Sequence, residues 1–261
     1  MRSIEALGAA TRRFLEHLGN LARLGWLTFK GLLLLHHAQF RVVASVLKAQ
    51  IRFTGTQALG LVCGSALLLG AVTLLQAYAQ VPGIGPERFT GLLLVAIVVR
   101  ELGPLLAAVL VIGRSATAIA AELASMRLNG EVEALEVHGV DPVQYILVPR
   151  MLGLIVALFG LTVFLDLSAL TGGFLVANLK AGMPLSSFLG QVQEVMVNRD
   201  LLVTLIKVWG FGTAIALQAC YFGLRVQSSH TEIPQAVTKA VVASLVAVFV
   251  VDGFLAAWVY A

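Results

Sequence analysis

Residues 53–86 read FTGTQALGLVCGSALLLGAVTLLQAYAQVPGIGP and contain no charged side chain. A helix needs about 20 mostly apolar residues to cross the hydrocarbon core of a bilayer, and residues 57–79 supply them. The proline and glycine residues at 82–86 end one helix and precede the next. This stretch therefore predicts a membrane-spanning helix followed by a short external turn.

Four further stretches satisfy the same criterion, so we expect spans at about 57–79, 89–113, 151–179, 201–224 and 240–261. The composition agrees, because 59% of the 261 residues are hydrophobic, 12% are charged and the mean hydropathy is +0.91. Soluble proteins average about 25% charged residues, which excludes a soluble enzyme, a disordered chain and a nucleic-acid binder. The predicted fold class is an all-α integral membrane protein.

Lysine and arginine residues are distributed unevenly between the two sides of these spans. Thirteen lie on one side, in residues 1–52, 114–150 and 225–239, and three on the other, Arg88, Lys180 and Arg199. Cytoplasmic loops carry the excess of lysine and arginine in membrane proteins. The bias predicts a cytoplasmic amino terminus and an external carboxyl terminus.

The amino-terminal region, residues 1–52, differs from the five-span domain at 53–261. Within residues 3–35, apolar side chains recur at steps of three and four while basic ones occupy the opposite face. This pattern is typical of a helix that lies in the plane of the membrane surface. A soluble helix packed on a partner protein is the alternative. The chain does not begin with the short apolar core of a cleavable signal peptide.

The loop at 114–150 is acidic although it lies on the cytoplasmic side. Its apolar stripe at helical spacing consists of Leu128, Val132 and Leu135, and its outward acids include Glu133 and Glu136. We expect a short amphipathic helix at about 125–139. It is either a docking helix for a cytoplasmic partner, which an apolar stripe rimmed with charge would suit, or a solvated connector.

Ionisable side chains interrupt the apolar spans at Arg100-Glu101, Asp166, Lys207 and Asp252. Each costs roughly 2.5–3.5 kcal/mol near the bilayer centre and usually faces a cavity or a partner. At a rise of about 1.5 Å per residue, all fall between the midplane and the outer face. We expect a polar-lined pocket there, with Lys207 and Asp252 paired and Arg100 or Lys207 able to meet a lipid phosphate. Alternatively, these charges only hold the helices together.

No catalytic constellation is apparent in the sequence. The phosphate-binding motif Gly-x-x-x-x-Gly-Lys-Ser/Thr does not occur, so ATP would have to be bound by a separate subunit. The two cysteines, Cys63 and Cys220, lie in apolar runs and predict neither a disulfide framework nor a zinc site. We expect no cofactor in this chain and no enzymatic activity of its own.

Short motifs follow one another in a fixed order along residues 90–260. They are RELGP at 100–104, GRS at 113–115, AEL at 121–123, MR at 126–127, EALEVHGVDP at 133–142, PR at 149–150, Lys207, YFG at 221–223 and TKAVVAS at 238–244. This set resembles the MlaE/YrbE permease family, the membrane subunits of ATP-binding-cassette (ABC) phospholipid transporters that work with MCE proteins. The chain departs from the family pattern with Glu131, where many relatives carry Gln, and with Ser115-Ala116 after Arg114, where Ala-Gly is usual.

The resemblance implies a homodimer in the bacterial inner membrane, with a cytoplasmic ABC ATPase, a periplasmic MCE-domain protein and a small cytoplasmic accessory subunit of the STAS type. It also implies that six residues bind the substrate or line the lipid cavity: Arg100, Glu101, Leu102, Tyr78, Lys207 and Asp252. It implies that the coupling helix at 125–139 meets the ATPase through Arg127, Leu128, Glu131, Val132, Glu133, Leu135 and Glu136.

We therefore expect a permease that moves phospholipids between the inner membrane and a periplasmic carrier and contributes to outer-membrane lipid asymmetry. Two alternative functions are compatible with the same sequence. One is a secondary transporter or channel with Glu101, Asp166 and Asp252 as a proton relay, although five spans cannot divide into the equal inverted repeats of many such folds. The other is a membrane scaffold that only anchors an ATPase.

Overall fold

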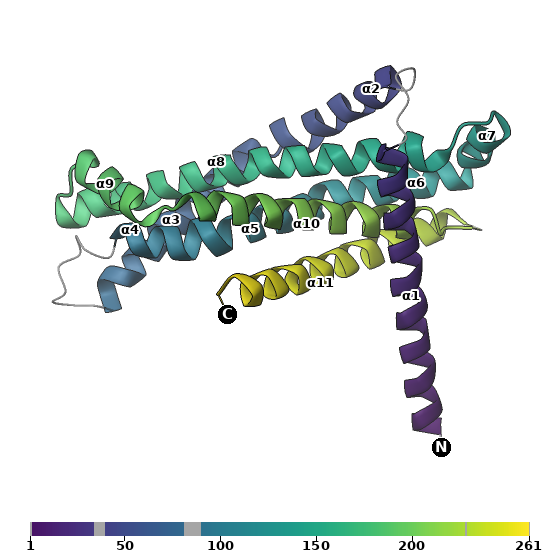
Figure 1. Cartoon of the computed structure of the whole chain (residues 1–261), viewed down its shortest axis with the longest axis horizontal. Coiled ribbons are helices and arrows are strands. Elements are labelled where there is room, and N and C mark those ends of the chain that lie inside the picture. The colour runs from purple at the N-terminus through teal and green to yellow at the C-terminus, as the bar shows by residue number, and fades with distance from the viewer. Residues whose placement is uncertain (1, 34–39, 81–89, 228, 261) are drawn as a thin grey trace.

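The computed structural model describes residues 2–33, 40–80, 90–227 and 229–260, and all regular elements in these ranges are helical (Figure 1). In chain order they are α1 (Arg2–Leu33), α2 (Phe40–Ile51), η1 (Arg52–Thr56), α3 (Leu59–Gln80), α4 (Thr90–Leu93), η3 (Leu94–Leu102), α5 (Gly103–Val111), η4 (Ile112–Ala116), α6 (Thr117–Leu128), α7 (Glu131–Val137), η5 (Val143–Leu147), α8 (Val148–Ala181), α9 (Leu185–Val195), α10 (Asn198–Gly223), η6 (His230–Glu232) and α11 (Ile233–Tyr260). The turn predicted at 82–86 lies outside the described residues.

Five helices are long and apolar enough to cross a membrane, which confirms the predicted number. They run over Ser45–Ala79, Thr90–Leu128, Val143–Ala181, Arg199–Gly223 and His230–Val259. The first begins well before residue 57 because α2 and η1 continue into α3, and so includes part of the region assigned to residues 1–52. The second continues past residue 113 to Leu128 and spans 39 residues. At 1.5 Å per residue it is roughly 58 Å long, so it extends beyond the hydrocarbon core.

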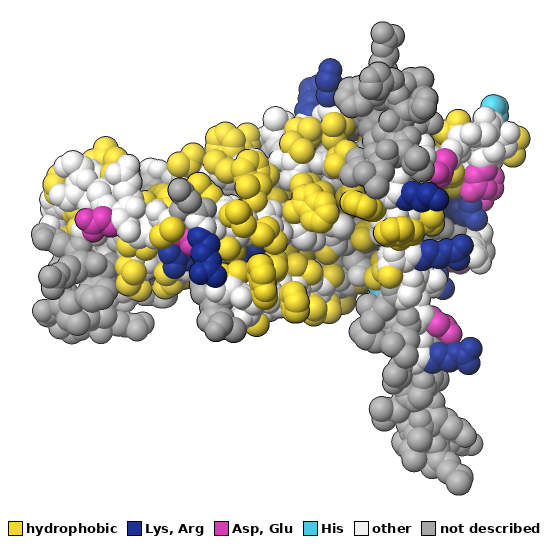
Figure 2. All heavy atoms as spheres, in the orientation of Figure 1, with side chains coloured by type: hydrophobic (Ala, Val, Ile, Leu, Met, Phe, Trp, Pro, Cys, Tyr) yellow, Lys and Arg dark blue, Asp and Glu magenta, His cyan; other side chains and the backbone are white. Residues whose placement is uncertain are grey.

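Helix α8 lies at the centre of the bundle and α11 at its edge. Helix α8 packs on α2, α3, α5 and α10, and among the spans it is the most buried, whereas α11 is the least. Figure 2 shows hydrophobic side chains over the middle of the bundle surface, where acyl chains would surround it. The fold thus has a protein-filled centre and an apolar surface that suits lipid.

The backbones of α3 and α8 touch at two glycines. A Cβ atom at Gly70 would overlap the carbonyl oxygen of Ala169, and one at Gly172 would overlap the carbonyl oxygen of Leu67. Small residues allow this close approach between membrane helices, where dispersion contacts replace the hydrophobic drive of water.

We expect Gly172→Ala to destabilise the chain by about 1–3 kcal/mol, because the added methyl group meets rigid backbone and the two helices must separate. Thermal unfolding in detergent measures the effect as a lower Tm. Gly160→Ala is the matched control in the same helix, since nothing lies within 4 Å of a Cβ atom there, and alanine favours the helix. Equal Tm values for the two variants would contradict the role given to the glycine contact.

Helix α1 crosses one end of the bundle at a steep angle to the spans (Figure 1). It contacts η5, α8 and α10, and its apolar Trp26 and Phe29 are exposed alongside the basic Arg23 and Lys30. This orientation and this mixture of exposed side chains fit a helix that lies in the membrane surface. The same end carries α7, the end of α10 and the start of α11.

His17 joins α1 to the end of α10. Its ring lies 4.8 Å from the Tyr221 ring and 5.4 Å from the Phe222 ring, measured between centroids. Burial and, to a smaller extent, the positive charge of Arg225 lower the pKa of His17 from its ordinary value of 6.5, against the opposing effect of a hydrogen bond with Gln218. The contact therefore favours the neutral imidazole.

We expect acid to loosen this contact. A base whose pKa is lowered on docking contributes its full stabilisation above its undocked pKa and loses it as the pH falls from there through the lowered value. The amides of α1 should therefore be less protected from hydrogen exchange at about pH 5 than at about pH 8. The comparison is made after the pH dependence of the intrinsic chemical exchange rate has been removed. His17→Phe should abolish this pH dependence. His138→Gln, at an exposed histidine directly after α7, should retain it. Retention in both variants would contradict the assignment.

Candidate functional site

Lys207 is buried in the bundle and joins three spans. Its Nζ atom lies 2.6 Å from Oε2 of Glu101 in η3 and 3.0 Å from Oδ1 of Asp252 in α11, and it donates a hydrogen bond to the backbone oxygen of Arg100 at 3.1 Å. The Lys207 side chain is 0% exposed. The predicted Lys207–Asp252 pair is confirmed, with Glu101 as an additional partner.

The cluster Lys207–Glu101–Asp252 holds two carboxylates and one ammonium group. Its net charge is negative, and the Oε1 atom of Glu101 has no hydrogen-bond partner within the described residues. Lys207 is enclosed by its partners and does not reach the bundle surface in this conformation, and contact between a lipid phosphate and Arg100 or Lys207 stays a prediction. The Glu101 side chain is 31% exposed as a whole, but its Oε1 atom is itself buried, so the unpartnered acceptor faces the interior of the bundle.

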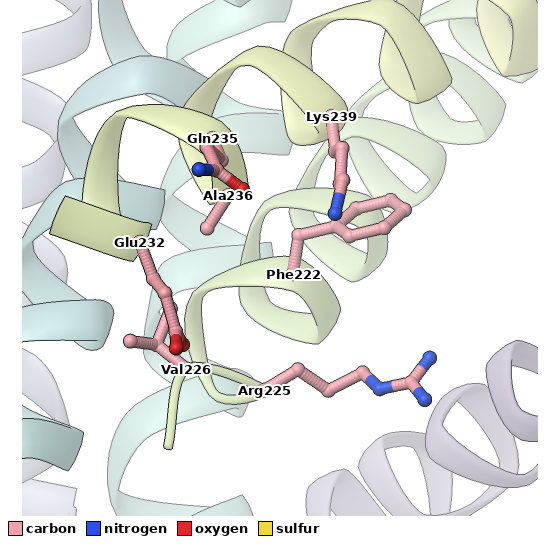
Figure 3. Close-up of a pocket in the computed structure, with 7 residues that line it drawn as sticks. All are labelled: Phe222, Arg225, Val226, Glu232, Gln235, Ala236 and Lys239. Carbon is pink, nitrogen blue, oxygen red and sulfur yellow. The ribbon is translucent and has the colours of Figure 1, made fainter. Parts of the chain in front are cut away.

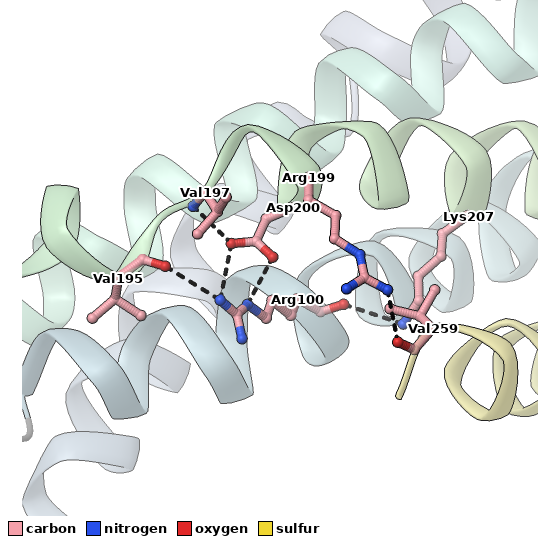
Figure 4. A network of polar contacts seen from close by, with 7 residues as sticks. All are labelled: Arg100, Val195, Val197, Arg199, Asp200, Lys207 and Val259. Atoms are coloured by element: carbon pink, nitrogen blue, oxygen red, sulfur yellow. Dashed lines mark hydrogen bonds and ion pairs between the residues drawn. The ribbon is translucent and has the colours of Figure 1, made fainter. Parts of the chain in front are cut away.

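Arg100 turns toward the first turn of α10 (Figure 4). Its Nε and Nη2 atoms lie 3.0 Å from the two carboxylate oxygens of Asp200, and Nη2 also donates to the Val195 carbonyl at 3.2 Å. Asp200 in turn accepts from the backbone N–H of Val197 at 3.0 Å. Only Nη2 makes a hydrogen bond with Asp200, since Nε has no hydrogen-bond partner among the described residues. The charge-assisted contact joins the second span to the start of the fourth.

A pocket of about 360 Å³ lies beside this pair. It is lined by Arg100, Val197, Arg199, Asp200, Val203 and Val259. Arg199 donates a hydrogen bond to the Val259 carbonyl at 2.9 Å and so connects the pocket to the end of α11 (Figure 4). Of the predicted cavity residues, Arg100 lines this pocket, and it does so with its guanidinium group already paired.

The segment predicted as one helix at 125–139 is divided in two. Helix α6 ends at Leu128, and α7 begins at Glu131 after a turn in which Gly130 has φ +73°. Glycine adopts this left-handed conformation without steric cost. The turn at Gly130 therefore allows α7 to run in a different direction from α6. Arg127 Nη1 and Glu133 Oε1 lie 2.5 Å apart and close the turn on one side.

The apolar stripe of this segment faces its own chain. Val132 is buried in the main core, Leu135 packs against that core, and Leu128 packs in a small cluster with Val226 and Ala236. The bundle covers Val132 and leaves Leu128 and Leu135 half-buried, and docking of a cytoplasmic partner by this segment stays a prediction. The face left to solvent carries Glu131, Glu133, Glu136 and Val137.

The family profile described as "Permease MlaE" matches residues 47–258. The chain belongs to the MlaE permease family. It is 30% identical, over 97% of its length and 96% of the relative's, to the intermembrane phospholipid transport system permease protein MlaE of Haemophilus influenzae. It is 31% identical to a probable ABC transporter permease protein of Rickettsia prowazekii over 79% of the chain and 80% of the relative. The protein TRIGALACTOSYLDIACYLGLYCEROL 1, chloroplastic, of Arabidopsis thaliana is 26% identical over 84% of the chain and 65% of the relative.

This MlaE-family permease brings together four of the six residues expected at the cavity. Glu101, Lys207 and Asp252 form one cluster, and Arg100 adjoins it through its backbone oxygen. Leu102 is half-buried at the end of η3. Tyr78 lies apart, with its hydroxyl 2.9 Å from the Thr90 hydroxyl, where it connects α3 to α4.

Two partners in this permease were not predicted from the sequence. Asp200 falls in the loop expected before the fourth span, although an acid in the first turn of a helix is a signal for both capping and ion pairing. Arg150 is 7% exposed in its side chain and pairs with Glu122 at 2.7 Å, between α6 and α8. Neither pair could be found from depth in the membrane alone.

Asp166, the remaining in-span acid, is separate from the Lys207 cluster. A Cβ atom on Gly103 would overlap its Oδ1 atom, so the carboxylate lies against the second span just after Leu102. That oxygen has no hydrogen-bond partner in the described ranges. Asp166 thus lies against the same span that carries Glu101. Unlike Glu101 and Asp252, it is not paired with Lys207.

Proposed function

We propose that this ABC transporter permease moves phospholipids between the bacterial inner membrane and a periplasmic MCE-type carrier, as a homodimer driven by a separate cytoplasmic ATPase. The single observation that carries the proposal is the likeness along 97% of the chain to a permease whose name specifies intermembrane phospholipid transport. The buried cluster at Lys207 supports it, because charged groups within spans usually mark a pathway.

The second span provides a mechanical route from the ATPase to this cluster. The helix Thr90–Leu128 is continuous and holds Glu101 near one end and the α6–α7 turn at the other. At 1.5 Å per residue, Glu101 and Leu128 are roughly 40 Å apart along it. A force applied at α7 would shift the helix against Lys207 and Asp252, and so open or close the bundle on one side of the membrane.

Glu101 lies in the π-helical element η3, where a shift of the second span would change its contact with Lys207. This element covers Leu94–Leu102, in the first third of the second span. π-helical turns are rare and occur frequently at functional sites, because they add a residue to the turn and re-aim the side chains that follow. In the proposed mechanism, a change of register in η3 would alter how Glu101 meets Lys207.

The proposal is tested by purifying the full chain from native membranes in a mild detergent and reconstituting it with whatever ATPase accompanies it. We expect transfer of a fluorescent phospholipid to or from an MCE-domain protein that requires ATP. Lipid mass spectrometry of the same preparation should find bound phospholipid. Transfer driven by a proton gradient without ATP would favour a secondary transporter, and an ATPase that accompanies the chain without any lipid transfer would favour a scaffold.

A further inference from the structure

A second pocket lies at the other end of the bundle, where α10 ends and α11 begins (Figure 3). It has a volume of about 430 Å³ and is lined by Phe222, Arg225, Val226, Glu232, Gln235, Ala236 and Lys239. Val226 and Ala236 are buried and give it an apolar side. None of these residues belongs to the Lys207 cluster or to the α7 surface.

The pocket offers two cations for one carboxylate. Lys239 is exposed and has no hydrogen bond or ion pair within the part of the chain that the structure describes. Arg225 donates to the Tyr221 hydroxyl at 2.6 Å through a single nitrogen, which leaves most of its five N–H donors available. Glu232 already accepts from the backbone N–H of Gln227 at 3.3 Å. The unsatisfied groups are therefore cationic donors.

Lys239 also heads an apolar stripe on α11. Val242, Val246 and Val250 follow it at helical spacing, and their side chains are 55%, 59% and 64% exposed. They lie on the same face of the helix as Lys239. The positive charge thus stands at the end of a strip of surface along which an acyl chain could lie.

The pocket includes Arg225 and Lys239 from residues 225–239, one of the three regions whose thirteen basic residues predict the cytoplasmic side. The cytoplasmic leaflet holds anionic lipids, and basic pockets between spans on that side bind their headgroups. Arginine suits a phosphate because its planar fork can donate two parallel hydrogen bonds. A soluble anion would use the two cations but not the apolar strip.

We propose that this pocket, defined by Arg225 and Lys239, binds the headgroup of an anionic phospholipid of the cytoplasmic leaflet, with one acyl chain along Val242, Val246 and Val250. This lipid is a bound regulator or structural ligand, not the transported molecule, because the site lies at the opposite end of α10 from Asp200. Since His17 of α1 packs on Phe222, the lipid also stabilises the docking of α1.

The test measures the Tm of the purified full chain in a zwitterionic detergent during titration with phosphatidylglycerol or with phosphatidylcholine of the same acyl chains. A ligand that binds only the folded state raises the Tm, so we expect a rise with phosphatidylglycerol alone. Arg225→Gln/Lys239→Gln should weaken the apparent affinity by roughly fivefold for each charge removed. Lys239→Gln alone should weaken it about fivefold, against about 25-fold for the double variant, and it touches no protein contact that folding needs.

Lys30→Gln/Lys48→Gln is the matched control, because it removes two exposed charges from α1 and α2 and should keep the full response to phosphatidylglycerol. An equal loss in this control would show a non-specific surface effect and overturn the proposal. An equal Tm rise with glycerol phosphate, which has no acyl chain, would assign the pocket to a soluble anion instead. A normal lipid response combined with loss of the accompanying ATPase in Arg225→Gln/Lys239→Gln would make the surface a protein contact.

Discussion

Replacing Lys207 with methionine should abolish phospholipid transport and lower the Tm of the chain further than Gly172→Ala does. Methionine keeps the volume of the side chain but removes the cation that Glu101 and Asp252 share. Removal of one partner from a buried ion pair costs about 3–5 kcal/mol, because the remaining charge is left uncompensated. Thermal unfolding and lipid transfer in proteoliposomes measure the two effects.

The triple variant Lys207→Met/Glu101→Gln/Asp252→Asn separates a structural role from a transport role. It removes all three charges together, so we expect most of the lost stability to return. If the charges take part in transport, lipid transfer by this stable variant stays at least about tenfold below that of the unmodified chain, a loss of about 1.4 kcal/mol or more. Transfer at the normal rate would mean that the cluster only holds the second, fourth and fifth spans together.

Reversing the charge at Glu136 should release the ATPase from the membrane subunit. Glu136 is exposed on α7 and its side chain makes no hydrogen bond or ion pair within the described residues, so we expect the substitution Glu136→Lys to leave the fold intact. If the acidic face of α7 docks the ATPase, a like charge placed against a basic partner surface costs several kcal/mol. We therefore expect about a tenfold or greater loss of ATPase recovered with the purified chain.

Glu194→Lys provides the control for this experiment, since Glu194 is exposed on α9 at the other end of the bundle and undergoes the same change of charge. Glu133 is a poorer choice, because it is paired with Arg127 and its reversal would disturb the turn itself. Unchanged recovery of the ATPase with Glu136→Lys would mean that α7 is a solvated connector.

Depth in the membrane could be predicted from the sequence, but neighbours in the bundle could not. Lys207 and Asp252 lie at similar depth along their spans, and the ion pair expected between them is present. Depth is only the axial coordinate of a residue. It contains no information about which spans are adjacent or how each is rotated, so Glu101 as a third member and Asp200 as the partner of Arg100 remained unpredicted.

The apolar periodicity of residues 125–139 likewise predicted a buried helix face without identifying the surface that buries it. A stripe such as Leu128, Val132 and Leu135 shows that one face of a helix is buried, but not what buries it. The break at Gly130 turns that face back onto the bundle, where the chain itself covers it. The five spans were easier to predict because each depends on local composition alone.

If α1 lies in the membrane surface, as its sequence pattern predicts, the surrounding membrane takes part in the proposed transport cycle. Helix α1 contacts both α8 and α10 at the same end of the bundle, so movement of these two spans relative to each other would rotate α1 within the layer of headgroups. Viscous drag on a helix of 32 residues then resists each turnover. The turnover rate should consequently rise with the fluidity of the cytoplasmic leaflet, even when ATP and lipid cargo are saturating.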